Sequence, residues 1–234
     1  MPSFVDPLPG LREAVFKRLA PRPNGTTPAP DAYEYRVFKR AFDLSSAIEE
    51  LEHLPAVLQS ARTFPQIVVL LKLYVVGWVS LSDILANLIN EAFDLGYAEQ
   101  DIQFNVILRN RKVVTSQLAA IVSRHRKTTD YDRFARLRND VVHRGTFEDP
   151  DVRALRNDYT VAVVKRAVQL GIENPTNQSI AESQVGSEMR IHDRIAELLA
   201  RKSSELSVHL EATRVLLKDL APAIVERVAA QPAS

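Results

Sequence analysis

The sequence contains no cysteine among its 234 residues. Disulfide bonds, thiolate nucleophiles and cysteine-ligated zinc sites are therefore excluded together. A chain without cysteine suits a reducing compartment. The residues at 1–20 also lack the basic segment and the apolar run of a signal peptide. We therefore expect a cytoplasmic protein.

Glycine is scarce as well, with seven residues, and neither G-x-G-x-x-G nor G-x-x-x-x-G-K-[ST] occurs. Dinucleotide and P-loop sites are thus excluded on motif grounds. H-E-x-x-H and G-x-S-x-G are also missing, and the five histidines show no pair at metal-ligand spacing. We therefore expect no metal and no cofactor. The net charge of +1 gives no global reason to expect nucleic acid, so such a case must rest on local charge.

The longest apolar run, IVVLLKLYVVGWVSL at Ile67–Leu81, is interrupted by Lys72. A membrane-spanning helix needs about 20 apolar residues with few charges, so we interpret the run as a buried core helix and expect no membrane association. Its valines would also suit a strand, but the apolar periodicity continues to Leu95, beyond the usual strand length. Pro65 is predicted in the first turn of this helix and Gly96 at its C-terminal cap.

Proline is concentrated near the N-terminus, where seven of the 13 prolines fall within the first 30 residues. The segment PRPNGTTPAP at 21–30 predicts a linker, with a short helix over 11–19 before it. Further along, the apolar spacing favours helices and no alternation of strands and turns occurs, so the predicted class is all-α. The expected helices cover 31–54, 67–95, 101–126, 130–144, a segment opening at Asp149 and Pro150, and 180–220.

Two of these helices have predicted inward faces. The first, over 31–54, is expected to bury Tyr35, Phe38, Phe42, Ile48 and Leu51. The last, over 180–220, is expected to pack through Ile191, Ile195, Leu198, Leu206, Leu210 and Leu217. Pro222 is predicted to bend or end that last helix.

The length suits one domain with extensions, and two small domains are the alternative. The predicted division is an N-terminal arm and linker over 1–30, a helical core over 31–175, and a long C-terminal helix over 176–234. That C-terminal helix is expected to pack on the core or on a partner copy.

One short segment brings together three polar residues suited to catalysis. RLRNDVVHRG at 136–145 contains Arg138, Asn139 and His143. A chain of this composition should show R-N-x3-H by chance only roughly 0.02 times. We predict that the segment ends an amphipathic helix, which begins at Thr129 or Asp130, has an apolar stripe and closes at Gly145. The stripe consists of Phe134, Leu137 and Val141.

The arrangement of Arg138, Asn139 and His143 on a helix of an all-α bundle resembles the R-[polar]-x3-H signature of the HEPN superfamily. The segment YDRFARLRNDVVHRGTFEDPDVRALRNDY resembles in particular HEPN proteins whose motif is RNDxVHRG. The resemblance implies an antiparallel, homodimeric helical bundle in which the motifs of both copies meet. It further implies a metal-independent endoribonuclease of a toxin–antitoxin or antiviral system, with an antitoxin or sensor protein as a partner. Arg138 and His143 would be the catalytic pair, and Asn139 the accessory polar residue.

The residue chemistry agrees with this implication. RNA cleavage without a metal needs a base for the 2′-hydroxyl, a cation for the charge growing on the phosphate, and an acid for the leaving 5′-oxygen. Histidine titrates near neutrality, and arginine stays charged with a fork that matches phosphate oxygens. However, Arg138 and His143 are five residues apart and diverge by about 140° on a helix. Either the arginine reaches around the helix, or it acts with the histidine of a second copy.

Positive charge gathers around the motif: the stretch 102–144 holds ten Lys and Arg against three acidic residues. SRHRK at 123–127 is the predicted phosphate-contact cluster. The residues expected to bind RNA are Arg124, Arg126, Lys127 and Arg144. The alternative is a solvated face balanced by acids elsewhere, such as those at 49–52.

A second reading of the function stays open. The chain would then be a catalytically silent HEPN-type module that binds RNA or a partner protein, with the long C-terminal helix as its interaction surface. In that case His143 would be an ordinary residue at a helix C-terminus, where a positive charge suits the helix dipole. The presence of arginine, asparagine and histidine together favours the ribonuclease.

Overall fold

The computed structural model describes residues 8–20, 29, 32–169 and 187–231. Across these ranges it contains helices and no strand, which confirms the all-α class. The predicted linker at 21–30 lies outside the described residues, except for residue 29. The division of the chain at residues 30 and 175 stays a prediction.

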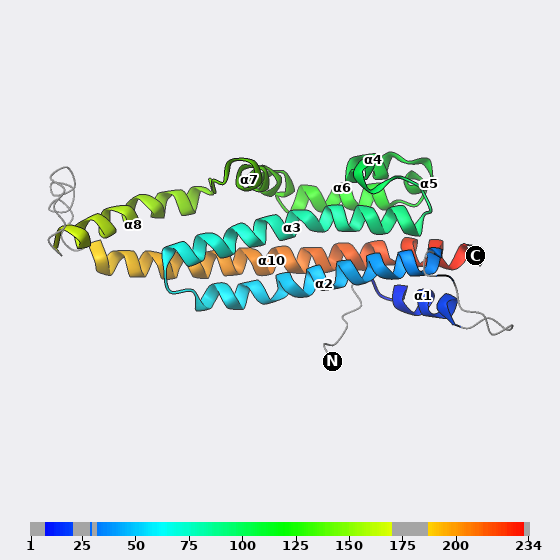
Figure 1. Cartoon of the computed structure of the whole chain (residues 1–234), viewed down its shortest axis with the longest axis horizontal. Helices are drawn as coiled ribbons and strands as arrows, with labels where there is room; N and C mark the ends of the chain where they lie inside the picture. Colours follow the sequence, from blue (N-terminus) through cyan, green and yellow to red (C-terminus); the bar gives the residue numbers. More distant parts are fainter. Residues whose placement is uncertain (1–7, 21–28, 30–31, 170–186, 232–234) are drawn as a thin grey trace. The chain divides into compact units, whose positions relative to one another are not determined.

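The helices follow the sequence order shown in Figure 1. They are α1 (Leu11–Leu19), α2 (Tyr33–Ser60), α3 (Phe64–Ala92), the short 3-10 helix η1 (Glu99–Asp101), α4 (Phe104–Arg109), α5 (Arg111–Val114), α6 (Leu118–Thr128), α7 (Tyr131–Arg144), α8 (Pro150–Gln169) and α10 (Ser187–Ala230). The described residues form two compact units. The first draws on Met1–His53, Gly77–Phe134 and Val208–Ser234, and the second on Leu54–Val76 and Ala135–Ser207.

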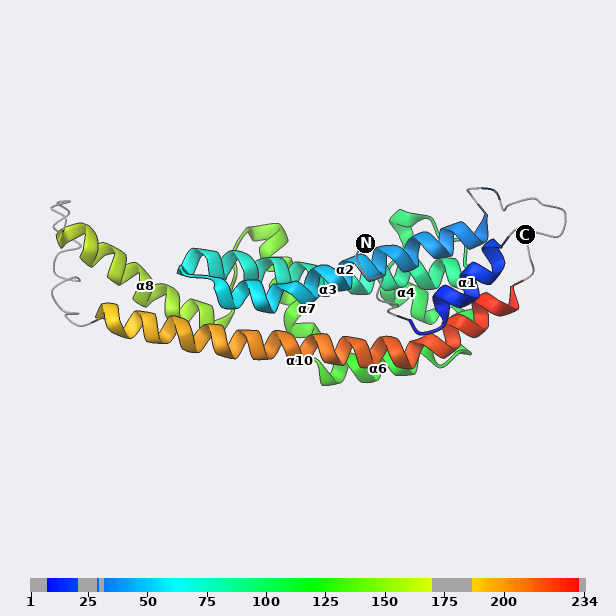
Figure 2. The same cartoon turned by 90° about the horizontal axis from the view of Figure 1, so that it is seen from below.

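In the first unit, parts of α2, α3, α6 and α10 pack around one core (Figures 1 and 2). Trp78 of α3 is buried there, and its indole Nε1 donates to Thr213 Oγ1 at 3.1 Å. Its ring stacks on His209, with 5.1 Å between the ring centroids. A cavity of about 30 Å³ beside Trp78 is also lined by Leu44 of α2 and Val122 of α6. The four helices therefore share a single core.

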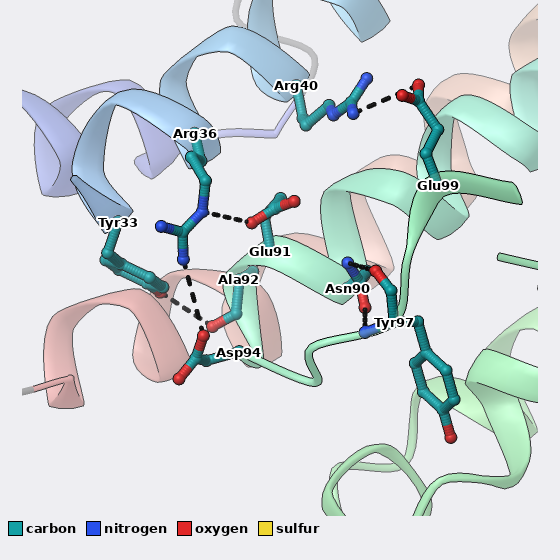
Figure 3. A network of polar contacts seen from close by, with 9 residues as sticks. All are labelled: Tyr33, Arg36, Arg40, Asn90, Glu91, Ala92, Asp94, Tyr97 and Glu99. Carbon is teal, nitrogen blue, oxygen red and sulfur yellow. Dashed lines mark hydrogen bonds and ion pairs between the residues drawn. The ribbon is translucent and has the colours of Figure 1, made fainter. Parts of the chain in front are cut away.

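Polar side chains join the start of α2 to the end of α3 in this unit (Figure 3). The Tyr33 hydroxyl donates to the Ala92 carbonyl at 2.8 Å, and Arg36 Nε donates to Glu91 at 2.9 Å. Burial raises the pKa of Tyr33 to about 12. The network also contains the ion pairs of Arg36 with Asp94 at 3.6 Å and of Arg40 with Glu99 at 3.4 Å. Because exposed ion pairs stabilise little, the buried Tyr33 hydrogen bond is the stronger link.

The end of α3 differs from the prediction. The left-handed residue after the helix is Asp94, with φ 48°, so the helix closes two residues before Gly96. The backbone N–H of Leu95 donates to the Asn90 carbonyl at 3.0 Å, as in a helix-ending Schellman motif. Aspartate tolerates this conformation better than most residues. Gly96 also has a positive φ, of 76°, but it lies in the loop beyond the cap.

The predicted inward face of α2 is correct only in its second half. Ile48 and Leu51 are buried, but Tyr35 and Phe42 are exposed, and Phe38 is half-buried. The helix buries a stripe of smaller residues instead, at spacings of three and four: Val37, Ala41 and Leu44. In the first half of α2, the aromatic residues therefore predicted the wrong face of the helix as the buried one.

The prediction of one helix over 101–126 is wrong. The chain forms α4, α5 and α6 there, with breaks at Asn110 and Gln117. Asn110 is extended, and its side-chain oxygen accepts from the backbone N–H of Lys112 at 3.0 Å. Gln117 is left-handed, with φ 64°, directly before α6. Asparagine favours such caps over helix interiors, because its side chain competes for backbone hydrogen bonds.

The long helix α10 confirms most of its predicted seam: Ile195, Leu198, Leu206, Leu210 and Leu217 are buried. The side chain of Ile191 lies outside the described residues. Pro222 does not end the helix, which continues to Ala230. Proline removes one backbone donor from a helix interior, and packing of neighbouring residues such as Leu220 and Ile224, both fully buried, offsets that cost.

In the second unit, α8 begins as predicted, with Asp149 as its cap and Pro150 as its first residue. Asp149 Oδ1 accepts from the backbone N–H groups of Asp151 at 3.1 Å and Val152 at 3.2 Å. These bonds satisfy donors that a helix start otherwise leaves without partners. Within the same unit, the Tyr74 hydroxyl of α3 donates to the Leu206 carbonyl of α10 at 3.4 Å.

By length and composition alone, α3 could cross a membrane, and 39% of its most apolar window is buried. Core helices of soluble proteins meet the same criterion. The cross-helix bonds of Tyr74 and Trp78 suit the interpretation of α3 as a core helix.

Candidate functional site

The sequence motif lies on the last two turns of α7, as predicted. The helix is anchored by its apolar stripe, in which Phe134 and Leu137 are buried and Val141 is half-buried. Gly145 closes it with φ 67°, and its N–H donates to the Val141 carbonyl at 3.1 Å. Thr129, a predicted start of α7, instead donates its hydroxyl to the His125 carbonyl at the end of α6.

The three motif side chains are accessible. Arg138 is half-buried, while Asn139 and His143 are exposed. Arg138 Nη1 donates to Asn139 Oδ1 at 3.4 Å, and its buried Nε has no hydrogen-bond partner. Among the residues that the structure describes, Arg138 forms no ion pair, and the His143 side chain has no hydrogen bond. A guanidinium charge and an imidazole are therefore both available to a ligand.

The two proposed catalytic groups do not meet within one helix. Arg138 turns toward its neighbour Asn139, and no bond between Arg138 and His143 occurs in the described part of the chain. This agrees with the divergence that the five-residue spacing predicts. Asn139 and His143, four residues apart, share one face of α7.

The segment after the motif, 145–149, is called the post-motif loop here. At its start, the ammonium of Lys72 on α3 donates to the Gly145 carbonyl at 2.7 Å. Sequence reasoning noted Lys72 only as an interruption of an apolar run. A charge isolated in such a run was the signal for this contact, because burying it would be costly without a polar partner.

Two further cations hold the rest of this loop. Arg156 of α8 donates to the carbonyl of the buried Phe147 at 3.0 Å. Lys202 of α10 is buried and pairs with the Asp149 carboxylate at 2.8 Å. Burial lowers the pKa of Lys202, but hydrogen bonds with Asp149 and Glu205 raise it more, so the pKa lies above its ordinary value. The post-motif loop is thus fixed by side chains from three helices.

The cations predicted to bind RNA fall into two environments. Arg124 and Lys127 on α6, in the first unit, are exposed. Arg144, in the second unit, is exposed and pairs with Asp140 at 3.2 Å. RNA binding by Arg124, Lys127 and Arg144 stays a prediction.

Arg126, the fourth predicted RNA contact, is engaged inside the first unit. Its Nη1 donates to Asn105 Oδ1 at 2.9 Å, and its guanidinium lies 4.3 Å from the ring centroid of Tyr131 and 5.2 Å from that of Phe104. This half-buried arginine therefore packs α6 against α4 and the start of α7.

His125, next to Arg126, lines the cavity beside Trp78. Burial, with a smaller contribution from the charge of His209, lowers the pKa of His125 to about 4. The imidazole is therefore neutral near pH 7. Within the residues described by the structure, no group of three or more His, Asp and Glu side chains is arranged to hold a metal ion.

Comparison with models of known protein families gives a match. The model of the HEPN_Cthe2314-like HEPN family matches residues 48–207, a span that contains the motif on α7 and the post-motif loop. No curated protein and no solved structure matches the chain.

Proposed function

The chain belongs to the HEPN_Cthe2314-like HEPN family, and on that basis we propose that it is a metal-independent endoribonuclease. The observation that carries the proposal is that Arg138, which has no carboxylate partner among the described residues, and an accessible His143 lie on the same helix end. A toxin or antiviral defence effector is the biological role that such an activity would serve, with an antitoxin or sensor protein to control it.

The chemistry follows from the two side chains. The imidazole of a neutral His143 removes the proton of an RNA 2′-hydroxyl, and the 2′-oxygen attacks the adjacent phosphorus. Arg138 stabilises the negative charge that grows on the phosphate oxygens. The bond from phosphorus to the 5′-oxygen breaks, and that oxygen takes up the proton that His143 removed from the 2′-hydroxyl. The products are a 2′,3′-cyclic phosphate and a 5′-hydroxyl end.

A composite site formed by two copies supplies both groups. Arg138 and His143 diverge on α7, so a two-fold axis beside the helix places the arginine of one copy near the histidine of the other. Asn139 lies on the same face as His143 and orients the imidazole or a phosphate oxygen through its amide. DNA lacks the attacking hydroxyl, so it is not a substrate.

The test is single-turnover cleavage of an end-labelled RNA in EDTA, with thermal melts of each variant. Arg138→Ala and His143→Ala should each reduce the rate by about 100-fold or more, and the double variant should be scarcely slower, because the residues act as a unit. Asn139→Ala should reduce the rate less. A strict requirement for magnesium would contradict the mechanism.

The cleavage rates can be interpreted only if the variant proteins are folded. His143 is exposed, so its loss should leave the melting temperature nearly unchanged. Arg138 is half-buried, and its alkyl packing should be worth about 1 kcal/mol. If the folded His143→Ala protein cleaves as fast as the parent, the motif is structural and the silent RNA-binding or protein-binding module is the better description.

A further inference from the structure

Lys72 is the only charged residue between Ile67 and Leu81. It lies on the part of α3 that belongs to the second unit, the unit that also contains Arg138 and His143. Its neighbours one, three and four positions away along the helix are all Val or Leu, so none of them compensates its charge. Lys72 is half-buried, so the part of its ammonium that is withdrawn from water needs polar groups on another element or in a ligand.

The group that Lys72 finds is the carbonyl of Gly145, at 2.7 Å. This carbonyl follows the end of α7, two residues after His143. A carbonyl is neutral, so the charge of the ammonium is not cancelled, and two of its three N–H donors stay available. In the described part of the chain, Lys72 forms no ion pair with any carboxylate.

Arg144, the other cation at this end of α7, differs in this respect. Its guanidinium pairs with Asp140 at 3.2 Å, one turn earlier on the same helix. The charge of Arg144 is therefore offset locally, although that exposed pair is weak. Lys72 and Arg138, like Arg156, have no carboxylate partner among the described residues.

Holding the post-motif loop does not by itself require the positive charge of Lys72. Gly145 is exposed, so water could satisfy its carbonyl almost as well as an ammonium does. What a lysine adds there is a positive charge held in a defined place beside the motif. Because the side chain is already fixed by the carbonyl, a ligand that binds it would cost less side-chain entropy.

We propose that Lys72 is a further substrate-binding residue of the site, one whose ammonium binds a backbone phosphate of the RNA strand while the Gly145 carbonyl holds it in place. The inference rests on the proposed function, because it requires RNA to approach the end of α7. It assigns to α3 a direct part in the site, in addition to its part in the core.

Three substitutions of Lys72 separate charge from hydrogen bonding. Lys72→Met keeps a straight apolar stem without charge or donor, Lys72→Gln keeps an N–H donor without charge, and Lys72→Arg keeps the charge. Lys39→Met is the matched control, since Lys39 is exposed on α2 in the first unit and its loss changes the net charge equally. Thermal melts show which proteins are folded.

The measurement is binding of a fluorescent single-stranded RNA at a series of salt concentrations, with His143→Ala present in every protein to prevent cleavage. Lys72→Met and Lys72→Gln should both raise Kd roughly fivefold at low salt and reduce the salt slope by about one ion. Lys72→Arg and Lys39→Met should stay within about twofold of the parent. Equal binding by the parent and Lys72→Met, or rescue by Lys72→Gln, would overturn the inference.

Cleavage assays with intact His143 distinguish this inference from the proposed function. If Lys72 is required for binding but the parent protein cuts no RNA, the ribonuclease proposal fails and the phosphate contact stands. If the parent cuts RNA and Lys72→Met cuts and binds equally well, the ribonuclease stands and the phosphate contact fails. A parent protein that binds no RNA overturns both.

Discussion

His125 shows how burial changes the chemistry of a single residue. Because its pKa is lowered to about 4, below the ordinary value of 6.5, the folded state favours the neutral imidazole. Its contribution to stability is therefore fully present above pH 6.5 and is lost as the pH falls toward 4. After a discount for partial exposure, we expect that loss to be about 1–2 kcal/mol.

His125→Gln should remove this part of the acid sensitivity. Chemical denaturation at intervals between pH 7 and pH 4 should show a smaller fall in the free energy of unfolding for the variant than for the parent. His53→Gln is the control, since His53 is exposed on α2. Parallel curves for His125→Gln and the parent would show that His125 is not the group responsible.

The cations of α6 should separate into RNA contacts and packing residues. Lys127→Ala and Arg124→Ala should each weaken RNA binding and reduce the salt slope by about one ion, while sparing cleavage at saturating RNA, because both side chains are exposed. Arg126→Ala should also lower the free energy of unfolding by about 1 kcal/mol through loss of its stacking on Tyr131. Unchanged salt slopes for Lys127→Ala and Arg124→Ala would favour a solvated face.

For single residues, the sequence predicted patterns within one helix, but it did not predict contacts between residues far apart in the chain. The motif could be recognised because Arg138, Asn139 and His143 lie on consecutive turns of one helix. The partner of Lys72 could not, because Gly145 meets it only after α3 and α7 have packed. The aromatic rings of Tyr35 and Phe42 suggested burial, but helix packing selected the smaller Val37 and Ala41 stripe.

Among the elements, two of the left-handed residues that border helices, Gln117 and Gly145, should respond to substitution with opposite signs. Gln117, with φ 64°, begins α6, and Gln117→Gly should raise the free energy of unfolding by about 0.5–1 kcal/mol by relieving backbone strain. Gly145, with φ 67°, ends α7, and Gly145→Ala should lower it by about 1 kcal/mol.

At Gly145, a steric clash does not contribute to the expected loss of stability. An added methyl group at Gly145 would meet no atom within 4 Å, so any loss of stability comes from the backbone conformation. Urea denaturation of the two variants measures both effects. If Gln117→Gly is destabilising, the entropy that glycine gains in the unfolded chain outweighs the relief of strain.

Element boundaries were harder to predict than element types. Caps with a strong chemical signature, such as Asp149 before Pro150, were placed correctly from the sequence. The break at Gln117 lacks such a signature, because glutamine usually favours helices. Pro222 carries the opposite signal, since a proline normally ends a helix, yet the buried residues around it keep α10 continuous.

For the whole molecule, we expect a homodimer in solution that forms through the α7 face carrying Asn139 and His143. Val142 lies within about 60° of Asn139 on the helix and is 49% exposed, so this face has an apolar residue to bury. Val142→Glu should shift the protein toward monomer, whereas Val163→Glu, on the equally exposed Val163 of α8, should not.

Light scattering coupled to size-exclusion chromatography at micromolar concentration measures the oligomeric state of each variant. Loss of dimer in Val142→Glu should be accompanied by loss of cleavage, because each composite site needs two copies. A parent protein that is monomeric and still cleaves RNA would show that Arg138 reaches around its own helix.

The post-motif loop has a consequence for the kinetics of binding. Its ends and middle are already held by Lys72, Arg156 and Lys202, so RNA does not have to wait for this segment to become ordered. Association should then be governed by the rate of diffusional encounter, which charge can accelerate, and not by a slower closing step. Selectivity among RNAs would have to arise from how long each one stays bound.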